Sequence, residues 1–192
     1  YTVYRHEGAL IRRTGGVASG PIPKMQMTNE IGRRVMQGGS RRAAIYASLS
    51  AEHPDAMKFL HCKDWNEMIV AGTGGLSIGD LKRADFNYPA PMDMTNISVN
   101  YGDAWLSQYR STGIVGDLFL TNVRQALKTA EPGFSFNFGA KANETLRNAC
   151  TEVTSEDDSD VCNLGSLNLV VSKRWTSCVM SVAWLRCSCF AE

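Results

Sequence analysis

The chain has 192 residues, of which 44% are hydrophobic and 20% charged, and its formal net charge is +1. These values are ordinary for a soluble globular protein, and so small a charge gives no reason to expect binding of nucleic acid or of an anionic membrane surface. No apolar run approaches the roughly 18 residues of a membrane span. The start, at Tyr1 rather than Met, carries no signal peptide. We therefore expect an internal piece of a longer cytoplasmic polypeptide.

The first half of the chain predicts strands that alternate with helices. Residues 8–23 are expected to form a short strand and a glycine-rich loop, in which Pro21 and Pro23 prevent a helix from starting. Apolar residues at helical spacing predict a helix over 24–37. A buried strand is expected over 43–49, and then a helix over 53–65 with Pro54 at its first position. The glycine cluster at 71–76 lacks the Gly-Lys-Ser/Thr of a phosphate-binding loop and is interpreted as a turn.

The second half continues this alternation. Residues 85–94 predict an irregular connection, residues 95–101 a strand, and residues 102–103 the start of a helix. A further helix is expected over 116–130 and a strand over 134–138. Strands that alternate with helices of this length predict an α/β fold with parallel pairing.

The tail at residues 170–192 differs in composition from the rest of the chain. It contains Cys178, Cys187 and Cys189 but neither the C-x₂-C spacing of a zinc site nor a histidine, so we predict no metal site. The six cysteines of the whole chain are also too unevenly spaced for a secreted disulfide framework. We interpret the tail as a segment that is not native to the fold.

Residues 146–153 contain the strongest chemical signal. Asn148, Cys150 and Glu152 occupy alternate positions. If the segment is extended, the three side chains project from one face, because successive side chains of a strand point to opposite sides. An amide, a thiol and a carboxylate would then face one pocket, and a second thiol, Cys162, follows along the chain.

Two thiol mechanisms find little support in the residues. A cysteine hydrolase needs a histidine to activate the thiol, and His6, His53 and His61 all lie far upstream. A thioredoxin-like exchanger would show Cys-x-x-Cys, which the spacing of Cys150 and Cys162 does not match. There remains a thiol beside a hydrogen-bonding amide and a carboxylate base, with a second thiol that can supply reducing equivalents. Cys62, next to His61, is interpreted as structural.

Seven segments, in this order, give the chain a specific resemblance to the catalytic subunit of ribonucleotide reductases. They are residues 14–21 (TGGVASGP), 37–42 (QGGSRR), 53–60 (HPDAMKFL), 92–99 (MDMTNISV), 131–138 (EPGFSFNF), 148–152 (NACTE) and 161–168 (VCNLGSLN). The resemblance implies that residues 1–169 are part of a ten-stranded α/β barrel, with residues 146–153 on a finger loop at its centre. Residues 85–99 look most like the adenosylcobalamin-dependent class II branch. Class I, whose radical comes from a di-iron small subunit, shares Asn-x-Cys-x-Glu and stays open.

The resemblance also implies catalytic roles. Cys150 would be the thiyl radical that abstracts the 3′ hydrogen of the ribose, and Glu152 would be the general base on the 3′ hydroxyl. Asn148 would hold the ribose hydroxyls and Glu152 in position. Cys162 would be one of two reducing thiols, and its partner would lie upstream of this chain. The residues implied in substrate binding are Asn148, Ala149, Cys150, Thr151 and Glu152. The chain would hold only part of the machinery and be inactive alone.

Two glycine-rich loops would sense deoxynucleotide or ATP effectors, because glycines allow motion and guanidinium groups suit phosphates and base edges. Their residues are Thr14, Gly15, Gly16, Ser19, Gly20, Gln37, Gly38, Gly39, Ser40, Arg41 and Arg42. The implied partners of the full-length protein are a ribonucleotide substrate, a thioredoxin-type reductant and a second copy in a homodimer. Two rival hypotheses are a non-catalytic nucleotide-binding or assembly module derived from the same barrel, and a plain thiol–disulfide oxidoreductase that uses Cys150 and Cys162.

Overall fold

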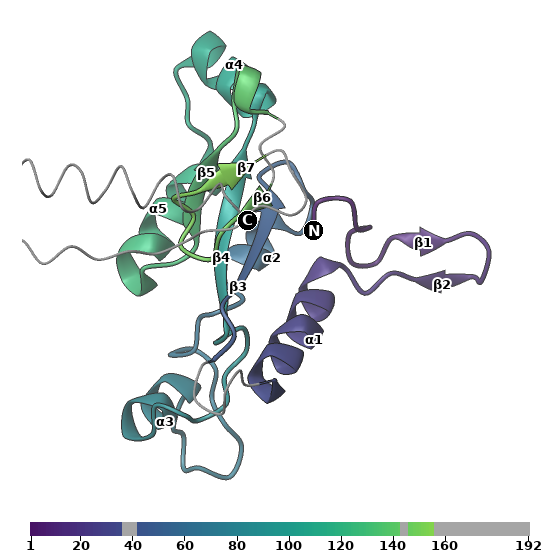
Figure 1. Ribbon diagram of the computed structural model, residues 1–192. Helices are drawn as coiled ribbons and strands as arrows, with labels where there is room; N and C mark the ends of the chain where they lie inside the picture. Colours follow the sequence, from purple (N-terminus) through teal and green to yellow (C-terminus); the bar gives the residue numbers. More distant parts are fainter. Residues whose placement is uncertain (36–41, 143–145, 156–192) are drawn as a thin grey trace, which may run out of the picture. The chain divides into compact units, whose positions relative to one another are not determined.

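The structure, a computed structural model, describes residues 1–35, 42–142 and 146–155 (Figure 1). The predictions for residues 37–41, for Cys162 and for the tail at 170–192 lie outside these ranges. The elements, in chain order, are β1 (Leu10–Ile11), β2 (Gly16–Val17), α1 (Pro21–Arg34), β3 (Ile45–Ser50), α2 (Ala56–Leu60), α3 (Ile78–Ala84), β4 (Thr95–Tyr101), α4 (Asp103–Thr112), α5 (Asp117–Thr129), β5 (Gly133–Phe136), the 3-10 turn η1 (Gly139–Lys141), β6 (Leu146–Arg147) and β7 (Thr154–Ser155).

A sheet of parallel strands in the order β3–β4–β5 forms the centre of the described fold (Figure 1). Ala47 lies opposite Ile97, and Leu49 opposite Val99, which in turn lies opposite Phe134. Helices occupy the connections between these strands, because parallel neighbours need a crossover rather than a tight turn. The predicted strands and their parallel pairing are confirmed, with ends shifted by one or two residues.

The two faces of this sheet differ in character. Side chains alternate between the faces along each strand, so the register assigns every strand residue to one of them. The apolar face carries Ala47, Leu49, Ile97, Val99, Tyr101 and Phe134. The polar face carries Ser48, Ser50, Asn96, Ser98, Asn100 and Ser135. Helices pack on the apolar face and form the core with it, so the polar face is the side available for a functional site.

Tyr101 lies at the centre of the apolar face and is fully buried. Its ring centroid lies 5.1 Å from that of Trp105 and 5.2 Å from that of Phe119, both in edge-to-face arrangements. The Tyr101 hydroxyl accepts a 3.1 Å hydrogen bond from the side-chain amide of Asn122, a buried residue of α5. Burial raises the pKa of Tyr101 above its usual value. The hydrogen bond satisfies a polar group that the core would otherwise leave without a partner.

Helix α1 begins earlier than the sequence predicted. The two prolines were expected to prevent a helix from starting before residue 24, and this expectation was wrong because Pro21 itself opens α1. A first-turn N–H has no partner within a helix, so proline loses nothing at that position. The segment over 8–23, predicted as one strand and a loop, instead forms the antiparallel β1–β2 hairpin followed by α1.

Helix α2 is shorter than predicted, and α3 was not predicted. Pro54 precedes α2, which ends at Leu60 rather than near residue 65. Helix α3 begins after Ser77, whose hydroxyl accepts a 3.1 Å hydrogen bond from the Asp80 N–H while the Asp80 carboxylate accepts one of 2.9 Å from the Ser77 N–H. The Asp80 carboxylate also accepts a 2.7 Å hydrogen bond from the Ser77 hydroxyl, and this bond, with those from the Ser77 N–H and Arg83, lowers the pKa of Asp80 to about 2. Ser-x-x-Asp is a helix-start signal in the sequence that would have predicted α3.

Two side chains fix helix α1 to the start of β4. The Asn29 side-chain carbonyl accepts hydrogen bonds from the Met94 N–H at 2.8 Å and from the Thr95 hydroxyl at 2.9 Å. Arg33 donates to Asp93 at 2.7 Å, and Asn29 donates to the same carboxylate at 3.3 Å.

In the described part of the chain, no helix combines the length and apolar character that a membrane crossing requires.

Candidate functional site

The segment that carries Asn148, Cys150 and Glu152 is a hairpin turn. Strands β6 and β7 pair antiparallel, with Leu146 opposite Ser155, and residues 148–153 connect them. The Thr151 N–H donates to the Asn148 carbonyl at 3.0 Å, which closes the turn. The prediction of an extended segment with three side chains on one face was therefore wrong. Short stretches of alternating polar residues do not distinguish a strand from the tip of a hairpin.

The turn nevertheless brings two of the three predicted groups together. The Asn148 side-chain amide donates to the Glu152 carboxylate at 2.8 Å. The Asn148 side-chain carbonyl accepts a 3.1 Å hydrogen bond from the Val153 N–H, so both ends of this amide are held. Cys150 lies between the two residues in the turn and is exposed. The site thus presents an accessible thiol at the tip of a turn whose base carries a hydrogen-bonded amide and carboxylate.

Backbone strain is present at Thr151, next to the exposed thiol. Its φ is 70°, in the left-handed region that β-branched residues rarely adopt. Such a conformation persists only where the surrounding structure imposes it, and strained residues of this kind cluster at functional sites. Here the constraints are the Thr151–Asn148 backbone bond and the Arg147 guanidinium, which donates to the Thr151 carbonyl at 3.4 Å.

The hairpin docks on the polar face of the sheet. Asn96, on the polar face of β4, donates to the Ala149 carbonyl in the turn. At the other end, Arg147 donates to the Asn137 side-chain carbonyl at 3.0 Å, and Ser135 of β5 donates to the same oxygen at 2.8 Å. These contacts hold the turn over strands β4 and β5, with Asn96 and Ser135 on the side that faces it.

Some buried polar atoms of this face have no hydrogen-bond partner among the described residues. They are the Tyr46 hydroxyl of β3 and the Asn100 side-chain carbonyl of β4. The amide of Asn100 does have a partner, because it donates to the Ser48 hydroxyl at 3.1 Å. A buried polar atom without a partner is destabilising, so these two atoms mark places where another polar group belongs.

The two described cysteines differ in environment. Cys62 is buried, and burial raises the pKa of its thiol to about 12. A thiol with so high a pKa is not a nucleophile at neutral pH, because only the thiolate reacts. Cys150 is exposed. This contrast agrees with the interpretation of Cys62 as structural.

The first predicted effector loop, residues 14–21, covers the end of the β1–β2 turn, strand β2 and the link into α1. Gly15, with φ 69°, follows β1 and donates to the Ile11 carbonyl at 3.0 Å. Gly20, with φ 81°, lies where a Cβ atom would come within 2.9 Å of the Asp55 carboxylate. That carboxylate also accepts a 2.9 Å hydrogen bond from the Glu7 N–H. Asp55 therefore holds the segment before the hairpin and leaves no room for a side chain at Gly20 after it.

The second predicted effector loop follows the C-terminal end of α1, and of its residues only Arg42 lies in the described part. The Arg42 guanidinium donates to the Asn87 side chain and lies 4.9 Å from the centroid of the Phe86 ring. Helix α1, which has 14 residues, is about 21 Å long at 1.5 Å per residue. Asn29 and Arg33 fix this helix to the start of β4.

The chain matches a known protein family over most of its length. Residues 1–177 match the ribonucleotide reductase barrel domain. The chain belongs to this family. The ribonucleotide reductase fold predicted from the sequence, an α/β barrel of which this chain is a part, is confirmed, and the parallel β3–β4–β5 sheet is consistent with a section of that barrel.

Several curated relatives in the ribonucleotide reductase family resemble the chain. The ribonucleoside-diphosphate reductase subunit alpha of Chlamydia trachomatis is 27% identical over 205 residues, covering 88% of this chain and 20% of the relative. The vitamin B12-dependent ribonucleoside-diphosphate reductase of Thermoplasma acidophilum is 30% identical over 172 residues, covering 86% of this chain and 22% of the relative. The ribonucleoside-diphosphate reductase large chain of Cryptosporidium parvum is 27% identical over 198 residues, covering 86% of this chain and 24% of the relative. The chain thus spans between a fifth and a quarter of the length of these relatives.

Sequence reasoning missed the residues that support the site. The polar face was visible as alternation in residues 95–101, where Asn96, Ser98 and Asn100 interleave with apolar residues. Half-buried strands commonly alternate in this way, so the pattern alone does not identify a functional face. The Asn29–Asp93 contact joins residues 64 positions apart and has no local signal.

Proposed function

We propose that this chain is a section of the catalytic subunit of a ribonucleotide reductase, which converts ribonucleotides to deoxyribonucleotides, and that Cys150, Glu152 and Asn148 carry its chemistry. The observation that carries the proposal is the 2.8 Å hydrogen bond between Asn148 and Glu152, with the exposed Cys150 between them. The relatives described above are named as ribonucleoside-diphosphate reductases, which favours a diphosphate substrate.

The chemistry assigns a distinct task to each group. The Cys150 thiyl would take the 3′ hydrogen atom of the ribose, and the Glu152 carboxylate would take the proton of the 3′ hydroxyl. The 2′ hydroxyl would then leave as water after accepting a proton from a reducing thiol. Asn148 would keep the carboxylate in position, which matters because a misplacement of about 1 Å can lower a rate by about 100-fold.

The electrons for this reduction would come from a pair of thiols. Cys162 and a cysteine outside this chain would together supply two electrons and become a disulfide, and Cys150 would return its hydrogen atom to C3′. Ribonucleotide plus dithiol thus gives deoxyribonucleotide, disulfide and water. A thioredoxin-type reductant would then restore the dithiol.

The radical source is proposed to be adenosylcobalamin, as in the class II branch. The relative from Thermoplasma acidophilum is named vitamin B12-dependent, whereas the others described above carry no cofactor in their names. Cys150 fits either source, because an exposed thiol at a turn tip can be approached by a radical carrier. Bound adenosylcobalamin would supply the radical, and the task of the protein is to position the thiol. Addition of adenosylcobalamin to the full-length protein without a small subunit tests this assignment.

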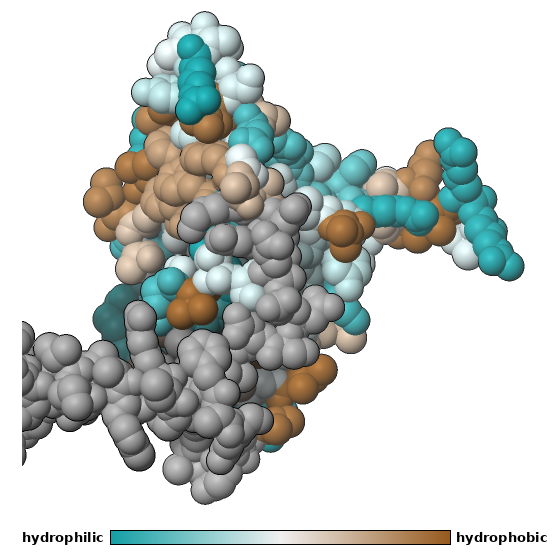
Figure 2. Space-filling model, turned by 45° about the horizontal axis from the view of Figure 1, so that its top comes forward, coloured by the Kyte–Doolittle hydropathy of each residue, from teal (hydrophilic) through white to brown (hydrophobic). Residues whose placement is uncertain are grey.

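Residues 14–21 and 37–42 are proposed as the effector loops of a homodimer. Met27 and Ile31 on α1 and Val35 directly after it recur every four residues and are 60%, 63% and 59% exposed. Leu10 and Val17 lie opposite each other in the β1–β2 hairpin and are exposed too, and hydrophobic surface is visible on the hairpin at the right of Figure 2. A second copy would cover both apolar surfaces. Replacement of Ile31 by Asp in the full-length protein should therefore shift its mass in solution from dimer to monomer.

Activity of the full-length protein tests the catalytic assignment. Cys150→Ser should abolish ribonucleotide reduction while binding of a deoxynucleotide effector stays unchanged. Cys62→Ser serves as the matched control, because this buried thiol has no proposed role and its replacement should leave turnover at saturating substrate unchanged. Substantial activity in the Cys150→Ser protein would exclude the proposed radical role.

A further inference from the structure

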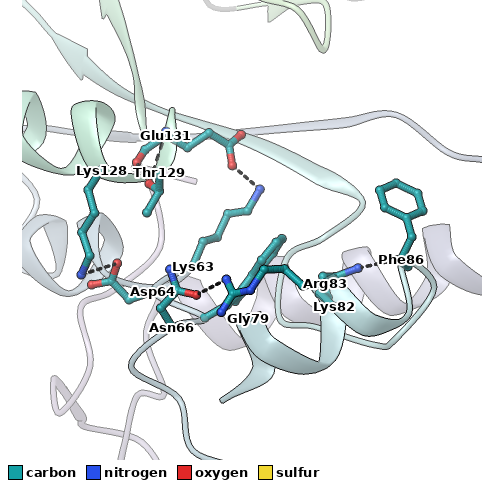
Figure 3. Close-up of a pocket in the computed structure, with 11 residues that line it drawn as sticks. Lys63, Asp64, Asn66, Gly79, Lys82, Arg83, Phe86, Lys128, Thr129 and Glu131 are labelled. Atoms are coloured by element: carbon teal, nitrogen blue, oxygen red, sulfur yellow. Dashed lines mark hydrogen bonds and ion pairs between the residues drawn. The ribbon is translucent and has the colours of Figure 1, made fainter. Parts of the chain in front are cut away.

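A basic cavity of about 310 Å³ shares no residue with the Asn148–Glu152 turn (Figure 3). It is bounded by the turn after α2, by α3 and Phe86, and by the end of α5. We propose that this cavity binds a planar aromatic compound that carries an anionic group, of the class of a nucleoside monophosphate. The proposal does not depend on the reductase activity, because it concerns a different set of residues.

The lining of the cavity carries more basic than acidic side chains. Its basic lining residues are Lys63, Lys82, Arg83 and Lys128, and its acidic ones are Asp64 and Glu131. Carboxylates next to the lining pair with these cations: Asp93 with Lys82, Asp80 with Arg83, and Glu67 with Lys128. An anion in the cavity would therefore bind through the N–H donors that these ion pairs leave unused.

The lysines keep donors available for a ligand. Lys63 pairs with Glu131 and donates to the Thr95 carbonyl at 2.9 Å. Lys82 donates to the Phe86 carbonyl at 3.0 Å and lies 3.3 Å from the Asp93 carboxylate. An ammonium group has three N–H donors, so each lysine retains one beyond these contacts with described residues. Their carboxylate partners hold the two ammonium groups in place without using all of their donors.

Two aromatic rings accompany these cations. The Trp65 ring centroid lies 5.4 Å from Lys63 Nζ and 5.5 Å from Lys82 Nζ, and the indole N–H is fixed by a 2.9 Å bond to the Pro91 carbonyl. Phe86 is 73% exposed although it is a large apolar residue. Stacking of a planar ligand would remove the apolar surface of Phe86 from water, and stacking on aromatic side chains tolerates any base.

Phe86 connects this cavity to the second glycine loop. Its ring centroid lies 5.5 Å from Nζ of Lys82, a residue of the cavity, and 4.9 Å from the guanidinium of Arg42. Phe86 also lines a neighbouring cavity of about 240 Å³ together with Arg42 and Arg33. Phe86 therefore lies between the proposed ligand and Arg42, the last residue of the second predicted effector loop.

The size of the cavity limits the ligand. Small-molecule sites usually measure about 300–1,000 Å³, so a volume of about 310 Å³ suits a base with one phosphate rather than a larger cofactor. Adenosine monophosphate is a suitable probe. Adenosine lacks the phosphate and ribose 5-phosphate lacks the base. The two compounds therefore test separately whether the cavity recognises the aromatic ring and the anionic group.

Calorimetric titration of the 192-residue chain with these three compounds tests the proposal. We expect adenosine monophosphate to bind more tightly than either half-ligand and less tightly at high salt. Phe86→Ala should weaken binding at least about fivefold through loss of stacking, and Arg83→Gln should weaken it through loss of charge. Both side chains are largely exposed, so their replacement should leave the fold intact. Phe136→Ala and Arg110→Gln are the matched controls, since both residues are exposed and neither lines the cavity.

Three results would overturn the proposal. One is the absence of measurable binding in the millimolar range. Another is equal weakening by Phe86→Ala and by the control Phe136→Ala. The third is equal affinity for ribose 5-phosphate and adenosine monophosphate, which would indicate an anion site without aromatic recognition. Asn148→Ala should leave this binding unchanged, so failure here is distinguishable from failure of the proposed reductase function.

Discussion

The side-chain amide of Asn148 donates a 2.8 Å hydrogen bond to the carboxylate of Glu152, across the turn that exposes Cys150. The same amide accepts a bond from the Val153 N–H, so one side chain fixes both the carboxylate and the backbone that follows it. Asn148 is therefore the residue on which the geometry of the candidate site depends.

Asn148→Ala should lower the turnover of the full-length enzyme about 10- to 100-fold, because the Glu152 carboxylate loses the group that positions it. In the 192-residue chain, hydrogen exchange of the Val153 amide should become faster, because it loses its acceptor. Gln26→Ala, on the exposed surface of α1, is the control and should change neither quantity. Normal turnover together with faster Val153 exchange would show that the turn matters for structure alone.

Asp93 should stabilise the fold in a pH-dependent manner. Burial opposes its charge, but hydrogen bonds from Arg33 and Asn29 outweigh burial and lower the Asp93 pKa below its ordinary value. Asp93→Asn should reduce the free energy of unfolding by about 3 kcal/mol near pH 7, because Arg33 and Lys82 lose a partner whose side chain is only 3% exposed.

The pH dependence of this effect has a definite sign. A carboxylate whose pKa is lower in the folded state stabilises the fold above its unfolded pKa of about 3.9, and this stability is lost as the pH falls through the folded pKa. The difference in unfolding free energy between the unsubstituted protein and the Asp93→Asn variant should therefore be full at about pH 6 and shrink below about pH 4. Urea unfolding at several pH values measures it, with the exposed Glu52→Gln as control. A difference that is independent of pH would contradict the assignment.

Ala130 ends helix α5 in a conformation that glycine adopts more readily. Its φ is 65°, and its N–H donates to the Ala126 carbonyl at 2.8 Å. Ala130→Gly should raise the free energy of unfolding by about 0.5–1 kcal/mol, because the Cβ penalty of the left-handed region disappears. Ala126→Gly, inside the same helix, should lower it by about 1 kcal/mol. Urea unfolding should show changes of opposite sign in the free energy of unfolding of the two variants. Changes of the same sign would contradict the left-handed conformation of Ala130.

The sequence predicted the parts of the molecule that depend on local patterns. The β4 strand was found because residues 95–101 alternate, and helix α1 because of its apolar spacing, although it ends at Arg34 rather than at residue 37. The turn at 148–153 was predicted as extended, since Asn-x-Cys-x-Glu fits both geometries and only the pairing of Leu146 with Ser155 decides between them. The Asn29–Asp93 and Arg147–Asn137 contacts depend on how distant segments meet, which no local pattern contains.

The two described thiols should react very differently with an alkylating reagent. Burial raises the pKa of Cys62 to about 12, so its reactive thiolate is scarce at about pH 8 and the side chain is also inaccessible. Cys150 lies exposed at the tip of the turn. Peptide mapping after brief treatment of the reduced, folded chain with iodoacetamide should show Cys150 modified at least about ten times faster than Cys62. The same treatment in denaturant is the control and should bring the two rates together, because unfolding removes the burial of Cys62. Equal rates in the folded chain would mean that Cys62 is not buried as described, or that the hairpin covers Cys150 instead of presenting it.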